Sequence, residues 1–303
     1  MTAGAEDARP DLSGWRVGVI GLGLMGRPMA RNLARAGAGL VVHSRSPGPV
    51  EELAHEGMEP AADPAGVAAG TDTVILMLTD SAAVEAVVEG PRGLLEGLRP
   101  GALVIDMGTT AVPATRRLAV RVAEAGCAWV DAPVSGGTVA AEAGTLTVMA
   151  GGADADVERA MPLFRALGAR ITHVGGTGTG QVAKAANQVI VGLTIGAVAE
   201  ALALARAAGA DPARVRDAIR GGFAESRILE LHGGRMVSGD FTPGARATVQ
   251  LKDMRQAEQL AAELGVTLPA VSLGRELYES LVGRGDGGLD HAALYRLFET
   301  SPR

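Results

Sequence analysis

Val17-Gly18-Val19-Ile20-Gly21-Leu22-Gly23-Leu24-Met25-Gly26 is the stretch that decides the fold of this chain. Its first four residues predict a strand, the glycines that follow have the spacing G-x-G-x-x-G, and a helical pattern begins at residue 25. Gly21 permits a tight turn, Gly23 lets a pyrophosphate approach the backbone, and Gly26 lets the helix pack closely on the strand. The amino end of that helix attracts an anion. We therefore expect residues 21–26 to bind a dinucleotide.

The second predicted strand, residues 40–43, ends in Ser44-Arg45-Ser46. An NAD-specific site usually carries Asp or Glu about 20 residues after the glycines, where it binds the ribose hydroxyls. No acidic residue occurs between Gly26 and Glu51. A guanidinium at Arg45, flanked by two hydroxyls, suits a 2′-phosphate instead. The stretch therefore predicts that NADP(H) is preferred, with NAD(H) possible, and that all three residues contact the cofactor.

The chain divides into two regions of different pattern. Short apolar runs alternate with helical patterns up to residue 174, which is typical of a largely parallel sheet covered on both faces. The expected strands are residues 17–20, 40–43, 74–78, 103–106, 128–131, 146–150 and 171–174. The expected helices between them are residues 25–36, 82–88, 114–124 and 156–167. We expect a flexible extension over residues 1–14 and an α/β domain over residues 15–174.

The region from residue 175 to residue 303 predicts helices and no strand. Glycines at 175, 176, 178 and 180 form the junction, and a long helix follows over residues 182–208. That helix is apolar on most sides, so it must be buried on most sides. We therefore expect an all-helical domain. We also expect partner subunits to complete the burial of this helix in a homodimer or homotetramer. Further helices are expected over residues 212–220, 224–236, 248–264, 269–282 and 290–300.

Composition excludes several classes of protein. The chain has 303 residues, a net charge of -6 and 3% aromatic residues, which disfavours binding to nucleic acid. A single cysteine, Cys127, excludes a disulfide framework. The longest uncharged run, residues 185–199, is shorter than the roughly 20 residues that span a bilayer, and no signal peptide is evident. We expect a cytoplasmic enzyme with no membrane partner. We expect no metal, because the histidines are scattered: His43, His55, His173, His232 and His291.

Two features predict the chemistry. Only two of the 28 basic residues are lysines, Lys184 and Lys252, and an ammonium can lose its proton on desolvation, whereas a guanidinium effectively cannot. Lys184 and Gln188 share one helix face, with Asn187 beside them, so Lys184 is a candidate general acid for reduction of a carbonyl. Ser135-Gly136-Gly137 follows a predicted strand and offers a hydroxyl and backbone N–H groups to a carboxylate.

Four motifs in order carry a resemblance to a known family: GLGLMG at 21–26, DAPVSGG at 131–137, GxGQxxKxxNQ at 178–188, and Leu251-Lys252-Asp253. Together they resemble the β-hydroxyacid dehydrogenases, which include 3-hydroxyisobutyrate dehydrogenase. The resemblance covers roughly residues 16–300 and implies a Rossmann-type α/β domain followed by an all-α domain. It implies that Lys184 is the catalytic acid and base. It implies a substrate carboxylate held by Ser135, Gly136 and Gly137 with Asn187 and Gln188 nearby, a nicotinamide near Thr109 and Lys252, and a ribose near Leu78 and Thr79.

Within the family, the stretches KAANQVIVGLTI, AIRGGFAES and LDHAALYRLFE are most similar to the 2-hydroxy-3-oxopropionate reductases. That similarity implies reduction of a small aldehyde acid, tartronate semialdehyde, to D-glycerate. Departures from the family pattern are Gly108, where a serine is usual, Ala245, where an aromatic residue is usual, and Glu225, where a small residue is usual. A dehydrogenase for 3-hydroxyisobutyrate or another 3-hydroxy acid is the near alternative. An imine reductase or a non-catalytic cofactor-binding module are more distant ones, and Lys184 disfavours both.

Overall fold

The computed structural model describes residues 10–299, and residues 1–9 of the predicted extension over residues 1–14 lie outside the described residues. The chain forms two compact units that divide between Lys184 and Ala185. The domain boundary at residues 174 and 175 stays a prediction. The compact units divide later because the first turn of the long helix is hydrogen-bonded to the α/β unit, as described below.

The first unit contains one sheet in the order β3-β2-β1-β4-β5-β6-β8-β7, with β9 beside β8. Neighbouring strands from β3 to β6 are parallel, whereas β8 is antiparallel to β6 and β7. The parallel strands therefore all end at one edge of the sheet. The strands are β1 (Arg16–Ile20), β2 (Gly39–His43), β3 (Glu59–Pro60), β4 (Thr73–Leu76), β5 (Leu103–Asp106), β6 (Ala128–Asp131), β7 (Val134–Ser135), β8 (Leu146–Gly151) and β9 (Gly168–Gly175).

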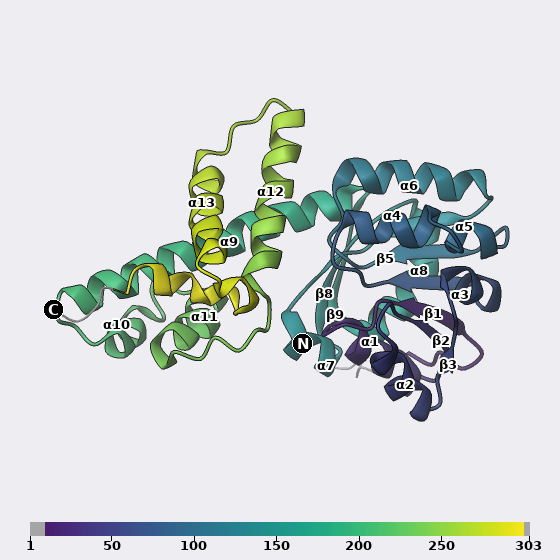
Figure 1. Cartoon of the computed structure of the whole chain (residues 1–303), viewed down its shortest axis with the longest axis horizontal. Coiled ribbons are helices and arrows are strands. Elements are labelled where there is room, and N and C mark those ends of the chain that lie inside the picture. Colours follow the sequence, from purple (N-terminus) through teal and green to yellow (C-terminus); the bar gives the residue numbers. More distant parts are fainter. Residues whose placement is uncertain (1–9, 300–303) are drawn as a thin grey trace, which may run out of the picture. The chain divides into compact units, whose positions relative to one another are not determined.

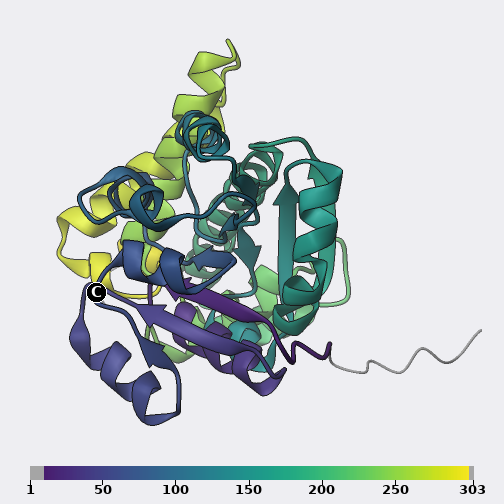
Figure 2. The same ribbon diagram turned by 90° about the vertical axis from the view of Figure 1, so that its right-hand side faces the viewer.

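Helices cover both faces of this sheet (Figure 1 and Figure 2). Residues of α1, α2, α7 and α8 share one apolar core with one face, and residues of α3, α4, α5 and α6 share another core with the opposite face. This confirms the predicted α/β class. The helices are α1 (Gly26–Arg35), α2 (Pro47–His55), α3 (Pro64–Gly70), α4 (Ser81–Glu89), α5 (Leu94–Gly97), α6 (Val112–Glu124), α7 (Gly137–Ala143) and α8 (Asp154–Leu167).

The second unit is helical, as predicted, and within its described residues the only β pairing is an isolated bridge between Arg246 and Asp290. Its core packs α9, α11, α12, α13 and the last 3-10 helix around Tyr278 and Tyr295. The predicted final helix is a 3-10 helix. The elements are α9 (Thr179–Ala207, which begins in the first unit), α10 (Pro212–Ile219), α11 (Arg227–Ser238), α12 (Ala247–Glu263), α13 (Pro269–Gly283), η1 (Asp286–Gly288) and η2 (His291–Leu297).

Helix α9 has 29 residues and is long and apolar enough, by length and composition, to cross a membrane. This helix is longer than the uncharged run of residues 185–199, because Lys184 and Glu200 lie within it as well. Hydrogen bonds anchor its first turn in the α/β unit. One third of its most apolar stretch is buried within the described chain.

Part of the predicted flexible extension is packed. Leu12 is fully buried in the core that contains α1, and its N–H donates to the carbonyl of Ala36 at 2.7 Å. An apolar side chain and a satisfied backbone group hold this segment on the α/β unit. The prediction of flexibility is therefore wrong at Leu12.

Candidate active site at the carboxyl edge of the sheet

The glycine loop follows β1 at the carboxyl edge, and Gly21 and Gly26 make the close backbone approaches expected of them. Gly21 has φ +99°, and a Cβ there would lie 2.3 Å from the carbonyl oxygen of Met77. A Cβ on Gly26 would lie 1.9 Å from the carbonyl oxygen of Gly21. Gly23 is exposed, and a Cβ there would meet no atom of the described residues within 4 Å. The loop therefore leaves space beside Gly23 for a pyrophosphate, which fits a dinucleotide at the amino end of α1.

Arg45 lies just beyond the carboxyl end of β2 and is exposed. Among residues 10–299 it makes no ion pair or side-chain hydrogen bond, whereas many arginines of this unit do, Arg27 and Arg31 with Glu52 among them. An arginine whose five donors have no protein acceptor can bind a phosphate with little reorganisation. The position fits the predicted 2′-phosphate contact.

The loops after β4 and β5 approach each other at the same edge. Leu78 and Thr79 follow β4, and Gly108 and Thr109 follow β5. A Cβ on Gly108 would lie 2.8 Å from the carbonyl oxygen of Leu78. The departure from serine at Gly108 therefore allows a close approach of the two loops. With glycine at residue 108, the hydroxyl of this turn that can reach a ligand is that of Thr109, which is partly exposed.

Asp106, the last residue of β5, organises the turn that carries Thr109. Its carboxylate accepts the N–H of Gly108 at 3.0 Å and the hydroxyl of Thr110 at 2.5 Å. The side chain of Gln181, from the first turn of α9, holds the same turn from the other side. Its Oε1 accepts the N–H of Thr110 at 3.1 Å, and its Nε2 donates to the carbonyl of Gly108 at 2.9 Å.

Asp131, the last residue of β6, fixes the start of α9. Its carboxylate accepts the N–H groups of Gly178 at 2.6 Å and Gln181 at 3.0 Å. Burial raises the pKa of the Asp131 carboxyl, although these N–H donors act in the opposite direction. A Cβ on Gly180 would lie 2.3 Å from the carbonyl oxygen of Met149, so only glycine allows this approach. Lys184, which is buried, lies one turn further along the same helix.

The predicted carboxylate site lies on β7 and the start of α7. Ser135 ends β7 and is partly exposed, and Gly136 and Gly137 have φ +129° and +64°. These positive φ values favour glycine. A Cβ on Gly137 would meet nothing within 4 Å, so the backbone there is open to a ligand.

The remaining predicted residues lie in the helical unit and form one hydrogen-bonded group. Gln188 donates to Asp253 at 2.6 Å and to Gln250 at 3.3 Å, and its Oε1 accepts from Asn187 at 2.8 Å. The ammonium of Lys252 lies 2.9 Å from the other carboxylate oxygen of Asp253. The structure therefore brings Asn187, Gln188 and Lys252 together around Asp253.

Sequence reasoning missed four residues that organise these groups, although three stand inside the quoted motifs. Asp131 opens DAPVSGG, Gln181 is the glutamine of GxGQxxK, and Asp253 follows Lys252. Asp106 ends a predicted strand. The usable signal was a polar residue where an apolar strand or helix was expected, because such a residue must be hydrogen-bonded when buried.

Two histidines treated as scattered meet in the helical unit. The Nε2 atoms of His232 and His291 are 3.3 Å apart, and His232 Nδ1 lies 3.4 Å from Asp290 Oδ1. These three residues could hold a metal ion by distance alone. However, both oxygens of Asp290 already accept backbone N–H groups, from Gly244, Ala245 and Ala292. The rings also meet edge to face, so the cluster has the character of a structural cap.

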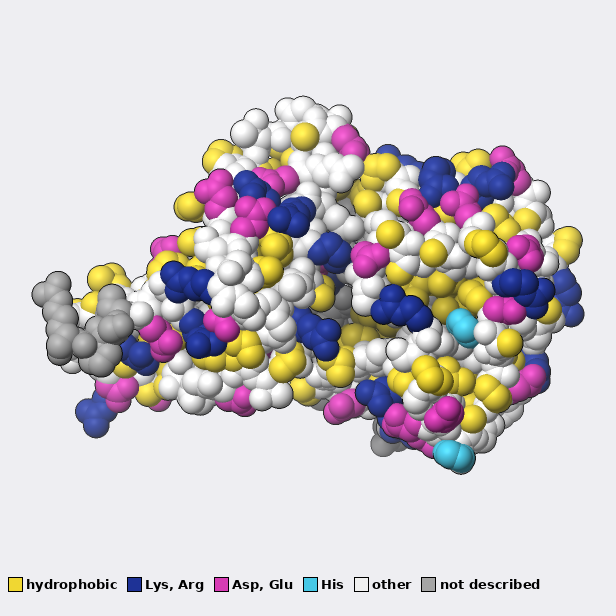
Figure 3. Space-filling model, in the orientation of Figure 1, with side chains coloured by type: hydrophobic (Ala, Val, Ile, Leu, Met, Phe, Trp, Pro, Cys, Tyr) yellow, Lys and Arg dark blue, Asp and Glu magenta, His cyan; other side chains and the backbone are white. Residues whose placement is uncertain are grey.

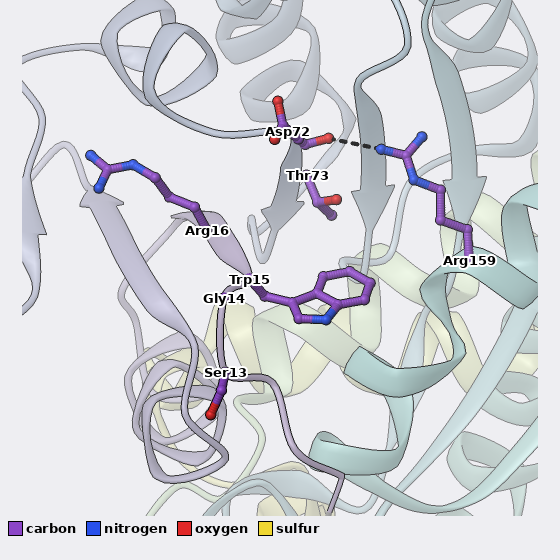
Figure 4. A pocket seen from close by; sticks show the side chains of 7 residues that line it. All are labelled: Ser13, Gly14, Trp15, Arg16, Asp72, Thr73 and Arg159. Carbon is purple, nitrogen blue, oxygen red and sulfur yellow. Dashed lines mark hydrogen bonds between the residues drawn. The ribbon is translucent and has the colours of Figure 1, made fainter.

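A cavity of about 310 Å³ lies at the opposite, amino edge of the sheet (Figure 4). Trp15 and Thr73 line its floor, and the two arginines at its sides are already engaged. Arg159 donates to the carbonyls of Gly101 and Asp72, and Arg16 donates to the carbonyl of Gly70. The cavity is therefore separate from the glycine loop, and its charged donors are occupied.

Comparisons with known proteins match both units. A family model described as the NAD binding domain of 6-phosphogluconate dehydrogenase matches residues 16–175. A second, described as NAD-binding of NADP-dependent 3-hydroxyisobutyrate dehydrogenase, matches residues 178–298.

Individual relatives agree with these models. The chain is 45% identical to the 2-hydroxy-3-oxopropionate reductase of Escherichia coli, over 94% of this chain and 97% of the relative. It is 34% identical to the 2-(hydroxymethyl)glutarate dehydrogenase of Eubacterium barkeri, over 94% and 95% of the two chains. Its structure matches a 3-hydroxyisobutyrate dehydrogenase of Mycobacterium tuberculosis, determined with L-serine, with TM-score 0.87 and 28% identity over 94% and 99% of the chains. The chain therefore belongs to the β-hydroxyacid dehydrogenase family and is an NAD(P)-dependent oxidoreductase that acts on CH–OH groups.

Proposed function

We propose that this enzyme reduces tartronate semialdehyde to D-glycerate, reversibly, with NADPH preferred and NADH possible. The observation that carries the proposal is the attachment of the Lys184-bearing turn of α9 to Asp131, at the same sheet edge as the glycine loop. A lysine held there can exchange a proton with a carbonyl oxygen beside the cofactor. The 45% identity to the E. coli reductase supports the choice of substrate.

In this proposal the nicotinamide, when bound, supplies the hydride that reaches the carbonyl carbon. Lys184 donates a proton to the carbonyl oxygen and takes it back in the oxidative direction. This transfer avoids a bare alkoxide in a site of low dielectric constant. Ser135 and the N–H groups near Gly136 and Gly137 hold the substrate carboxylate, and Asn187 and Gln188 complete the substrate contacts.

The cofactor contacts in the proposal lie along the carboxyl edge. Residues 21–26 surround the pyrophosphate, and Ser44-Arg45-Ser46 bind the 2′-phosphate. Leu78 and Thr79 contact the ribose, and Thr109 and Lys252 contact the nicotinamide end. The open space beside Gly23 and the donors of Arg45, which have no side-chain partner among residues 10–299, support this arrangement.

A dehydrogenase for 3-hydroxyisobutyrate or another 3-hydroxy acid is the second candidate. The relatives favour it in part, because the M. tuberculosis structure was determined with L-serine and the E. barkeri relative is named for 2-(hydroxymethyl)glutarate. All of these compounds carry a carboxylate and a hydroxymethyl group, so the same catalytic residues serve them. Imine reduction and a purely binding role need no lysine at residue 184 and are disfavoured.

We further propose a cytoplasmic homodimer or homotetramer that binds neither nucleic acid nor membrane. On the face shown in Figure 3, basic and acidic side chains of the described residues are interspersed, and the basic ones form no single continuous patch. That distribution and the net charge of -6 are unfavourable for binding a phosphate backbone.

Lys184→Ala and Lys184→Arg test the proposal. Turnover with NADPH would be measured on tartronate semialdehyde and on a panel of other 2- and 3-oxo acids. Lys184→Ala should lower kcat by roughly 10²- to 10⁴-fold, the usual contribution of a positioned acid, while NADPH affinity by fluorescence titration changes little. Lys184→Arg should also fail, because guanidinium keeps its proton. Normal turnover by the Arg variant would show that residue 184 supplies only a charge.

A further inference from the structure

The side chain of Gln181 forms a two-point clamp on the turn that follows β5. It is 2% exposed, its Oε1 accepts the N–H of Thr110, and its Nε2 donates to the carbonyl of Gly108. These two bonds fix the peptide groups on both sides of Thr109. Since a planar amide offers an acceptor and a donor side by side, it can hold both groups at once.

Gln181 is itself fixed by the backbone. Its N–H donates to Asp131 at 3.0 Å, and a Cβ on the preceding residue, Gly180, would clash with the carbonyl of Met149. The first turn of α9 therefore cannot shift without breaking the contacts to β6 and to the turn after β5. Lys184 lies three residues after Gln181, on the neighbouring part of the same helix face.

We propose that Gln181 is a positioning residue, which locks Thr109 and Lys184 into one rigid unit at the carboxyl edge of the sheet. The inference rests on the proposed function, because it gives Thr109 and Lys184 their roles. Gln181 reaches neither substrate nor cofactor in this proposal. It acts by holding the acid at a constant distance from the turn that faces the nicotinamide, and a misplacement of about 1 Å can lower a rate 10²-fold.

Gln181→Met removes both hydrogen bonds and keeps the length of the side chain. We expect kcat to fall by about 10- to 100-fold, with a much smaller change in the NADPH dissociation constant, because the glycine loop and Arg45 are untouched. Hydrogen exchange at the Thr110 amide should accelerate, since that N–H loses its acceptor. This readout is independent of turnover.

Gln181→Glu gives a sharper test through its pH profile. A protonated carboxyl can accept from Thr110 and donate to Gly108, as the amide does, whereas the ionised form cannot donate. The ratio of variant to wild-type kcat should therefore rise as the pH is lowered. The Met variant should show no such rise, so rescue at low pH separates a donor at this position from general packing.

Two matched controls keep the test specific. Thr115→Val alters a buried α6 residue whose hydroxyl has no hydrogen-bond partner among residues 10–299, and Gln259→Met alters an exposed glutamine of α12. Both should keep kcat within about twofold. Unchanged kcat in Gln181→Met, or a flat pH ratio in Gln181→Glu, would overturn the inference while Lys184→Ala remains impaired. Wild-type turnover by Lys184→Ala would instead overturn the proposed function.

Discussion

At the scale of one residue, we expect Arg45 to set the preference between NADPH and NADH. A charge-assisted bond to a phosphate contributes roughly 1.5–3 kcal/mol, or about 10- to 150-fold in affinity. Arg45→Ala should weaken NADPH by about that factor and leave NADH almost unchanged, because only NADPH carries the 2′-phosphate. Fluorescence titration with both cofactors measures the difference.

A second exposed arginine of the same unit serves as the control. Arg170 lies on β9 and is exposed, so Arg170→Ala removes the same charge away from the glycine loop. It should leave both affinities unchanged. Equal loss of NADPH and NADH in Arg45→Ala would contradict the 2′-phosphate contact.

Residues whose role follows from local backbone geometry could be predicted from the sequence. The spacing of Gly21, Gly23 and Gly26 fixes a loop whatever surrounds it, so the tight turn at Gly21 and the close packing at Gly26 were predictable. Gln181 was different, because its partners Gly108 and Thr110 are distant in sequence and meet it only after the sheet forms. No local pattern contains that information.

At the scale of one element, Asp290 links several segments of the helical unit. It caps η2 by accepting the N–H of Ala292 at 3.0 Å, and it also accepts the N–H groups of Gly244 and Ala245. Burial acts to raise the pKa of Asp290, yet the contact with His232 and the charge of His291 outweigh it and hold the pKa well below its usual range. Arg235, 3.7 Å away, adds a further positive charge.

The low pKa of Asp290 predicts a pH dependence of stability. The pKa of Asp290 in the folded protein lies below the unfolded value of about 3.9. The ionised carboxylate therefore adds to the free energy of unfolding above about pH 4, and this contribution is lost as the pH falls below that value. Asp290→Asn should lower the free energy of unfolding of the helical unit at pH 7 by about 1–3 kcal/mol. It should also flatten the decline below pH 4.

The chain offers separate probes for the two units. Both tyrosines, Tyr278 and Tyr295, lie in the helical unit and both tryptophans, Trp15 and Trp129, lie in the α/β unit. Urea unfolding followed in the tyrosine and tryptophan bands therefore reports each unit. Asp211→Asn, which alters the exposed cap of α10, is the control and should change stability by a few tenths of a kcal/mol. An equal effect of both variants would argue against a special role of Asp290.

Elements were predictable where the pattern was long. The central strands and the helices that were predicted lie within a few residues of their predicted bounds, whereas α2, α3, α5 and α7 were not predicted. The two-residue strands β3 and β7 were missed, because two residues show no periodicity. The start of α4 was misplaced by one residue, since Asp80 caps it by accepting the N–H of Ala83. The hydroxyl of Ser81, the first residue of α4, accepts the N–H of Ala111, which is a long-range contact.

At the scale of the whole molecule, the sequence predicted a largely parallel sheet. Parallel neighbours end at one edge, so the residues after β1, β4, β5 and β6 had to meet there. It did not predict how α9 is attached, because Asp131 reaches the N–H groups of Gly178 and Gln181 across almost fifty residues of chain. The departure at Glu225 also has a local account, since its carboxylate accepts the N–H of Gly221.

Helix α9 also predicts the assembly. Its exposed residues include an apolar stripe at helical spacing, formed by Ala186, Ile190, Ala197, Ala201 and Leu204. Ile190 is 66% exposed and Leu204 is 72% exposed. A continuous apolar stripe on a helix is typical of a buried contact. We expect a second copy of the chain to cover it.

Ile190→Glu tests this assembly with a single change. In a symmetric contact the new carboxylate appears on both subunits, and like charges at an interface cost several kcal/mol. The dissociation constant should therefore rise by about 100-fold, which corresponds to about 2.7 kcal/mol, and sedimentation at micromolar protein should show the shift. Val120→Glu, at a residue of α6 that is 59% exposed, should leave assembly unchanged. A wild type that sediments as a monomer would contradict the prediction, because the stripe on α9 would then have no second copy to cover it.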